Sequence, residues 1–191
     1  MLGAHGLAGN GIGRYSSSEL ADATAHPDGS LELLSGGSAL GSLEWHALPR
    51  LDLYSYYGGE FDKRAYYATG AFVTTPGPTL GQPILTGYGA PTNVVSGCYT
   101  EVLPVSSPNG GGNVPGSAAN CNSDTRNIQE GTVGYWYRLY RGTHGTLQQG
   151  IQYSYLVRHT WLGIGDPAAG LNSPKAINNM WFTSFRYYLP Q

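Results

Sequence analysis

Residues 132–159 constrain the fold most, because they form two long alternating stretches joined by a short break. In 132–140 and in 146–159, apolar or aromatic residues occupy mainly the odd positions and polar residues mainly the even ones, around the break at 141–145. Side chains alternate between the two faces of a β-strand, so the stretch predicts a hairpin with one apolar and one mostly polar face. The apolar positions are Val133, Tyr135, Tyr137, Leu139, Leu147, Ile151, Tyr153, Tyr155 and Val157.

Two kinds of fold accommodate such a hairpin. In a soluble sandwich the apolar face packs on a second sheet, whereas in an outer-membrane barrel it faces lipid and the polar face lines a lumen. Both arms are long enough for a tilted membrane-spanning strand of about 9–11 residues, while soluble strands have about 5–6. The apolar positions are rich in tyrosine, which suits a bilayer interface better than a dry core.

The composition fits long strands joined by glycine-rich loops. Charged residues are 12% of the chain, against about 25% in a typical soluble domain. There are 29 Gly and 15 Tyr but only 4 Phe. The net charge of −2 does not indicate the basic surface that nucleic-acid binding requires. No apolar run approaches the roughly 18 residues of a transmembrane helix.

The chain is expected to form a single β domain over residues 1–191, because one pattern of strands and loops runs through it. The predicted segments are a loop or the remnant of a preceding loop with at most a short hairpin (1–35), a strand hairpin (38–66), a long loop (68–126), a second hairpin (127–161), a loop (162–176) and a terminal strand (178–190). We therefore expect an all-β antiparallel meander of about five long strands.

The lengths of the connections separate the two folds. They alternate between short (48–50), very long (68–126), short (142–145) and long (162–176). A membrane barrel has short periplasmic turns on one rim and long extracellular loops on the other. We therefore predict part of a transmembrane β-barrel, since about five strands cannot close one and the smallest have eight.

The two cysteines, Cys98 and Cys121, lie in one polar, loop-like stretch. A loop pair of this kind predicts a disulfide and an oxidising compartment, with two free thiols as the alternative. Residues 1–10 lack the basic start and the continuous apolar stretch of a signal peptide. We therefore expect the sequence to be the C-terminal part of a longer exported protein.

Motifs of catalysis are not found in the sequence. It contains no Gly-x-Ser-x-Gly, no His-Glu-x-x-His and no P-loop, and its five histidines are scattered singly. Asp52, Glu60 and Asp62 resemble a glycosidase acid pair only loosely, and with Arg64 on the same parity they indicate a solvated face. The sequence predicts no enzyme, no cofactor and no metal site.

Charged and amide residues fall on the polar parity of the strands. The candidate lumen-lining residues are Arg64, Arg138, Arg158, Arg186, Asp52, Glu60, Asp62, Gln148 and Gln152. They indicate either a generic polar lumen tied by ion pairs or a charged constriction that selects solutes. Under the second interpretation, the wall with Arg138 and Arg186 near one rim and Arg158 near the other favours anionic or hydroxyl-rich solutes. The acidic residues balance its positive charge.

The chain resembles the C-terminal part of porin-like outer-membrane β-barrel proteins of diderm bacteria. The resemblance covers most of residues 38–190 and is carried by 43–46, 51–60, 134–140 and the terminal Phe185-Arg186-Tyr187-Tyr188-Leu189. It implies a bacterial outer-membrane location, contact with outer-membrane lipid, recognition by the barrel-assembly machinery and passive passage of small polar solutes. It leaves open a homo-oligomer, and it implies no nucleic-acid partner.

Two alternative functions remain at the level of sequence. One is a secreted β-sandwich that binds carbohydrate, with Trp45, Trp136 and Trp161 as a stacking surface. The other is a non-conducting barrel that serves structure or adhesion through its long loop. Detergent extraction separates the first alternative from the barrel, and bilayer conductance separates the second.

Overall fold

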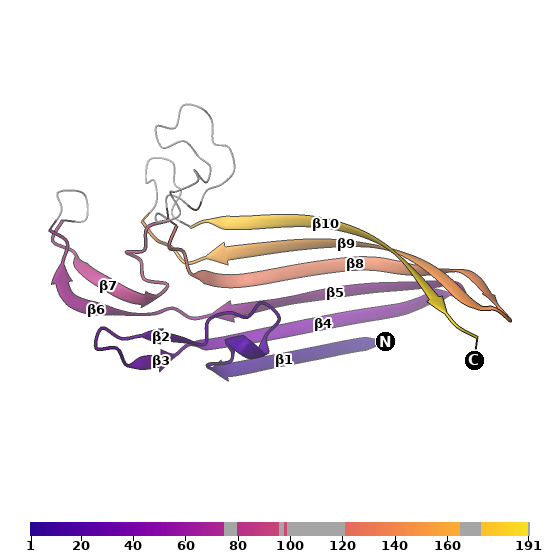
Figure 1. Ribbon diagram of the computed structural model, residues 1–191, viewed down its shortest axis with the longest axis horizontal. Helices are drawn as coiled ribbons and strands as arrows, with labels where there is room; N and C mark the ends of the chain where they lie inside the picture. The colour runs from indigo at the N-terminus through magenta and orange to yellow at the C-terminus, as the bar shows by residue number, and fades with distance from the viewer. Residues whose placement is uncertain (75–79, 96–97, 99–120, 165–172, 191) are drawn as a thin grey trace, which may run out of the picture.

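Six long antiparallel strands form one large sheet in the computed structural model, which describes residues 1–74, 80–95, 98, 121–164 and 173–190 (Figure 1). Their order across the sheet is β1-β4-β5-β8-β9-β10. The strands are β1 (Leu2–Asn10), β4 (Ser35–Leu48), β5 (Leu51–Asp62), β8 (Thr125–Gly142), β9 (Gly145–Thr160) and β10 (Lys175–Tyr188). The prediction of an all-β antiparallel meander is confirmed.

Three smaller elements lie in the connections. They are a 3-10 turn η1 (Gly13–Tyr15), a hairpin of β2 (Ala23–Ala25) and β3 (Leu31–Leu33), and a hairpin of β6 (Ala65–Phe72) and β7 (Pro83–Tyr88). Among the described residues, no helix is long and apolar enough to cross a membrane.

The register joins the apolar positions of neighbouring strands into one surface. Leu53 of β5 pairs with Trp45 of β4 and with Tyr135 of β8. Tyr135 in turn pairs with Ile151 of β9, and the paired positions Tyr153 and Trp181 continue onto β10. Paired residues of antiparallel strands project to the same side of a sheet. We call the side with Trp45, Leu53, Tyr135, Tyr153 and Trp181 the apolar face, and the opposite side the polar face.

The apolar face is not covered by any other part of the described chain. Trp45, Val133, Phe185 and Trp181 keep 60%, 53%, 67% and 72% of their surface exposed. Among the described residues, the buried apolar side chains are few, namely Leu20, Leu34, Ala90 and Val95. A soluble monomer rarely exposes a contiguous apolar patch of more than a few hundred Å². The apolar face therefore differs from the surface of a typical soluble monomer.

Long and short connections lie at opposite ends of the sheet. The turns after β4 and β8 leave only residues 49–50 and 143–144 between strands. The small hairpins β2–β3 and β6–β7, which belong to the long connections, lie at the other end of the sheet, and β1 begins and β10 ends toward the end with the short turns (Figure 1). The predicted alternation is present, and the connection 11–34 between β1 and β4 extends it.

Most predicted strand ends differ from the structure by two or three residues, and the larger differences are at three places. Residues 2–10 form β1 rather than a loop, and Leu2 pairs with Leu43 of β4. The small residues of β1 give little hydrophobic contrast between its faces, so its alternation was not visible. The second strand ends at Asp62 rather than near 66, and β6 and β7 fall within residues predicted as hairpin end and loop.

The sheet is open and does not close into a barrel. Its edges are β1 and β10, and each pairs with one neighbour only in the described part of the chain. The large sheet has six strands, one more than the predicted five. Because unpaired backbone groups on an edge strand favour pairing with another strand, both edges are sites for extension of the sheet.

Candidate solute-binding site on the polar face

Two glycines on the polar face make room for aromatic rings from the neighbouring strand. Tyr54 pairs with Gly134, where an added Cβ would lie 2.5 Å from the Tyr54 hydroxyl. Trp136 pairs with Gly150, where a Cβ would lie 2.8 Å from Trp136 Cε3. A glycine opposite an aromatic residue lets the ring lie across the adjacent strand. The polar face therefore carries an aromatic platform between its charged groups.

Arg186 of β10 completes this platform. Its guanidinium carbon lies 3.8 Å from the centre of the Trp136 ring, which is a cation–π stack. No hydrogen bond or ion pair joins the Arg186 side chain to another residue in the described part of the chain. Its N–H groups therefore have no acceptor among the described residues.

A pocket of about 450 Å³ lies beside the stack. It is lined by Glu44, His46, Asp52, Leu53, Tyr54, Tyr56, Trp136, Arg138, Gln148, Gln152, Arg186 and Tyr188. Tyr54 donates its hydroxyl to Gln152 Oε1 at 3.1 Å, and Tyr56 donates to Glu44 Oε1 at 3.0 Å. The pocket therefore combines aromatic surface with ordered amide and carboxylate groups, and its size suits a small molecule.

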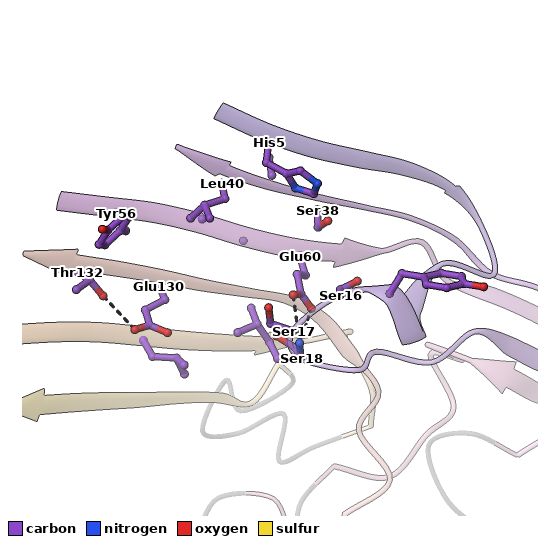
Figure 2. A pocket seen from close by; sticks show the side chains of 16 residues that line it. His5, Ser16, Ser17, Ser18, Ser38, Leu40, Tyr56, Glu60, Glu130 and Thr132 are labelled. Carbon is purple, nitrogen blue, oxygen red and sulfur yellow. Dashed lines mark hydrogen bonds between the residues drawn. The ribbon is translucent and has the colours of Figure 1, made fainter. Parts of the chain in front are cut away.

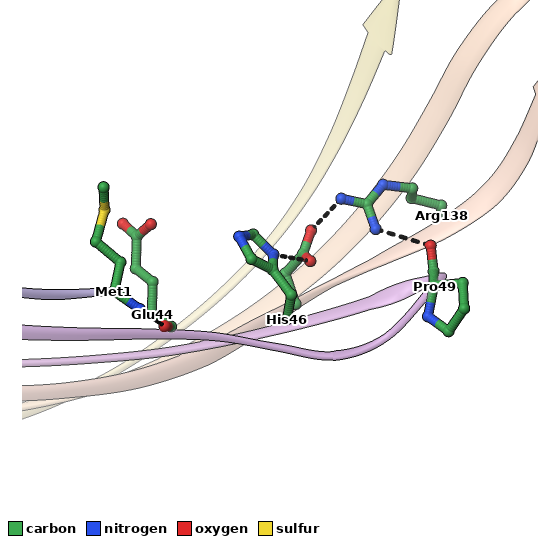
Figure 3. A network of polar contacts seen from close by, with 6 residues as sticks. Met1, Glu44, His46, Pro49 and Arg138 are labelled. Carbon is green, nitrogen blue, oxygen red and sulfur yellow. Dashed lines mark hydrogen bonds and ion pairs between the residues drawn. The ribbon is translucent and has the colours of Figure 1, made fainter.

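Arg138 is held within the protein, unlike Arg186. It donates from Nη2 to Asp52 Oδ2 at 2.5 Å and from Nη1 to the Pro49 carbonyl at 3.1 Å (Figure 3). His46 Nδ1 lies 2.6 Å from the other Asp52 oxygen. These contacts tie the short turn after β4 to β8. Arg138 therefore acts as a structural clamp whose charge is matched by Asp52.

A second pocket of about 370 Å³ lies on the polar face nearer the long connections (Figure 2). The chain after η1 folds against this part of the sheet, where the Ser18 amide lies 3.1 and 3.2 Å from the Glu60 carboxylate oxygens. Arg14 and Asp22 close the segment with an ion pair of 2.6 Å. On the sheet side, Thr132 donates to Glu130 Oε1 at 3.1 Å. Residues 13–22 therefore narrow the space above the polar face.

The structure brings some of the predicted lumen residues together. The register places Arg138, Gln148 and Arg186 at one level across β8, β9 and β10. Gln152 lies one polar-face position beyond Gly150 on the same strand and accepts from Tyr54. Arg158 lies near the other end of β9, as predicted, and donates to Thr125 Oγ1 at 2.8 Å.

Other predicted lumen residues are separated from this group. Glu60 and Asp62 lie at the long-connection end of β5, where Asp62 is 3% exposed and its Oδ2 has no hydrogen-bond partner among the described residues. Arg64 follows the end of β5, and its guanidinium carbon lies 5.2 Å from the centre of the Trp161 ring. The expectation that Arg64 shares the polar face of the second strand is wrong, because that strand ends before it.

Sequence reasoning missed the aromatic part of this site. Tyr54, Tyr56 and Trp136 are exceptions to the polar parity of their strands. For Tyr54 and Trp136 the signal is the pairing of an aromatic residue with a glycine on the next strand, and recognising it requires the register. The contact of Ser18 with Glu60 was also missed, because the two residues lie 42 positions apart in sequence and only the fold brings them together.

The predicted disulfide between Cys98 and Cys121 is present, with the two Cα atoms 4.7 Å apart. Close to Cys121 in sequence, the Asp124 carboxylate accepts hydrogen bonds from the Gly89 amide at 2.6 Å and from Asn93 Nδ2 at 2.9 Å. Burial raises the pKa of Asp124, although these two hydrogen bonds oppose the shift. The disulfide and this half-buried carboxyl both lie where the long connection joins β8.

No protein-family model, curated protein or solved structure matches this chain. Within the described ranges, no group of three His, Cys, Asp or Glu side chains is placed to hold a metal ion. The functional argument therefore rests on the two faces of the sheet and on the pockets of the polar face.

Proposed function

We propose that this chain forms part of the wall of an outer-membrane β-barrel, and that the barrel gives small polar solutes passive passage. The apolar face would contact lipid and the polar face would line the lumen. The observation that carries the proposal is the exposed apolar face, which continues in register across the five strands from β4 to β10 of the large sheet, opposite a face of charged, amide and hydroxyl groups.

Strand length and connection length both support the proposal. The five strands from β4 to β10 in the large sheet have 14, 12, 18, 16 and 14 residues. A tilted membrane-spanning strand needs about 9–11 residues. The short turns would face the periplasm and the long connections would face outward. Further strands would be needed to complete the wall, since the smallest barrels have eight.

A soluble sandwich fits these observations less well. It would require a second sheet on the apolar face, and the two small hairpins leave Trp45 and Trp181 exposed there. The carbohydrate-stacking alternative needs Trp45, Trp136 and Trp161 on one surface. Trp45 instead lies on the apolar face, Trp136 lies on the polar face, and Trp161 follows the end of β9 beside Phe61.

The neighbours Gln152 and Tyr153 offer a test of the two faces. We expect Gln152→Cys in the full-length protein, folded in lipid vesicles, to react with a water-soluble thiol reagent. Tyr153→Cys should not react, because its side chain would face lipid. The reagent should also lower bilayer conductance in the Gln152→Cys variant only. Equal labelling at both positions would count against a lipid-facing surface.

Two further outcomes bear on the proposal. If the full-length protein is monomeric and soluble without detergent, a barrel wall is the wrong assignment. If the protein requires detergent and the labelling differs as expected but no conductance is measured, the chain belongs to a non-conducting structural or adhesion barrel. Fractionation of the native envelope checks the location, since the protein should be found with the outer membrane.

A further inference from the structure

We propose that the pocket beside Arg186 is a subsite for small hydroxylated organic anions, whose carboxylate would bind the Arg186 guanidinium. The proposal rests on the passage function above, because it names the solute class of that same polar face. It differs from a generic charged lumen in assigning the selective contact to one arginine.

Hydrogen bonding in the pocket singles out Arg186. Arg138 already pairs with Asp52, which also contacts His46, so these groups are satisfied within the protein. Glu44 accepts the hydroxyl of Tyr56. In the described part of the chain, Arg186 is the pocket arginine without an acceptor, and an anion would supply one.

The stack on Trp136 prepares Arg186 for this role. Trp136 lies over Gly150, and the guanidinium lies 3.8 Å above the ring centre. A stacked guanidinium is held in a plane and keeps its N–H edge free for two parallel hydrogen bonds to a carboxylate. Because less side-chain freedom is lost on binding, such a group binds more tightly than a mobile surface arginine.

The surroundings of Arg186 suit hydroxyl groups. Gln148 occupies the paired position on β9, and its side chain forms no hydrogen bond within the described residues. The Tyr54 hydroxyl and the Gln152 amide lie on the same wall, joined at 3.1 Å. An amide can both donate to and accept from a hydroxyl. A sugar acid therefore combines the two chemistries that the pocket offers, within a volume of about 450 Å³.

The probe is D-glucuronate, with D-glucose as the neutral control that lacks the carboxylate. Binding is measured by calorimetry and tryptophan fluorescence on the full-length protein folded in detergent micelles, where no passage is needed. We expect glucuronate to bind at least about tenfold more tightly than glucose. The fluorescence change should largely vanish in Trp136→Phe, which removes the reporter but keeps an aromatic ring.

Arg186→Gln should weaken glucuronate binding at least about tenfold, the effect of losing about 1.4 kcal/mol of charge-assisted hydrogen bonding. Arg186→Lys should give an intermediate loss, because it keeps the charge but not the planar fork. The matched control is Arg141→Gln, which removes the same charge from β8 outside the pocket and should leave affinity within about twofold. Circular dichroism checks that each variant folds.

Equal weakening by Arg186→Gln and Arg141→Gln would overturn the proposal, since it would indicate general charge attraction. Equal binding of glucose and glucuronate would also overturn it. Failure here remains distinct from failure of the proposed passage. A protein that conducts but does not bind glucuronate contradicts the subsite alone, whereas one that binds but does not conduct contradicts the passage alone.

Discussion

Val133→Arg measures the environment of the apolar face directly. Val133 lies near the middle of β8, is 53% exposed and pairs with Tyr153. If this face were in water, the new guanidinium would stay solvated. The free energy of unfolding would then fall only by what the contacts of a half-exposed valine contribute, about 0.5–1 kcal/mol. Near the middle of a bilayer, an arginine on the lipid face of a barrel costs about 2–4 kcal/mol.

The matched control is Ser42→Arg on the polar face of β4. Leu43, the next residue, lies at the level of Val133 through their common partner Ser55. The polar face also carries Glu44 close by, so Ser42→Arg should cost within about 1 kcal/mol. Val133→Thr separates the effect of shape from that of charge, because threonine is nearly isosteric with valine.

Reversible unfolding of the full-length protein from phospholipid vesicles, monitored in urea, gives the free energies. We expect Val133→Arg to lower the free energy of unfolding by about 2–4 kcal/mol, and Ser42→Arg by clearly less. If the two arginine variants differ by less than about 0.5 kcal/mol, which is within the context dependence of such values, the lipid-facing assignment is wrong.

Three further predictions concern groups outside the apolar face. Replacing both Cys98 and Cys121 by Ser should lower the free energy of unfolding by about 3 kcal/mol in the chain-entropy model for a loop of this length. Mass spectrometry of protein from the native envelope should show the disulfide. Free thiols in that protein would contradict export. Arg138→Ala should lower the free energy of unfolding in denaturant by about 1–2 kcal/mol, because it leaves the mostly buried Asp52 carboxylate without the arginine cation. No change would mean that the ion pair between Arg138 and Asp52 does not stabilise the fold. Because burial raises the pKa of Asp124 above its ordinary 3.8, its contribution to stability is complete below about pH 4 and is lost as pH rises through the folded pKa. Denaturant unfolding over a range of pH should show this loss, and Asp124→Asn should flatten the pH dependence. An identical pH profile in the variant would refute the assignment.

Alternation and spacing were readable from the sequence because both are local. A strand places every second side chain on one face, so residues 132–159 revealed two faces without knowledge of their neighbours. The short turns and long connections follow from Pro, Gly and Asn content along the chain. The predicted disulfide needed only two cysteines in one polar stretch, and the structure contains it.

Register and pairing were decided by the tertiary structure. The residues of β1 are mostly small, so their alternation carries little hydrophobic contrast, and it is backbone pairing with β4 that makes them a strand. Gly134 is informative only once Tyr54 is known to lie across it, and those two residues belong to strands far apart in sequence.

The two central arginines illustrate the same division. Parity alone put Arg138 and Arg186 on one face and gave them one role. The fold instead brings Arg138 to Asp52, 86 residues away, and leaves Arg186 stacked on Trp136. Parity follows from the chain itself, whereas a charge partner depends on which strand lies alongside, and long-range pairing sets that.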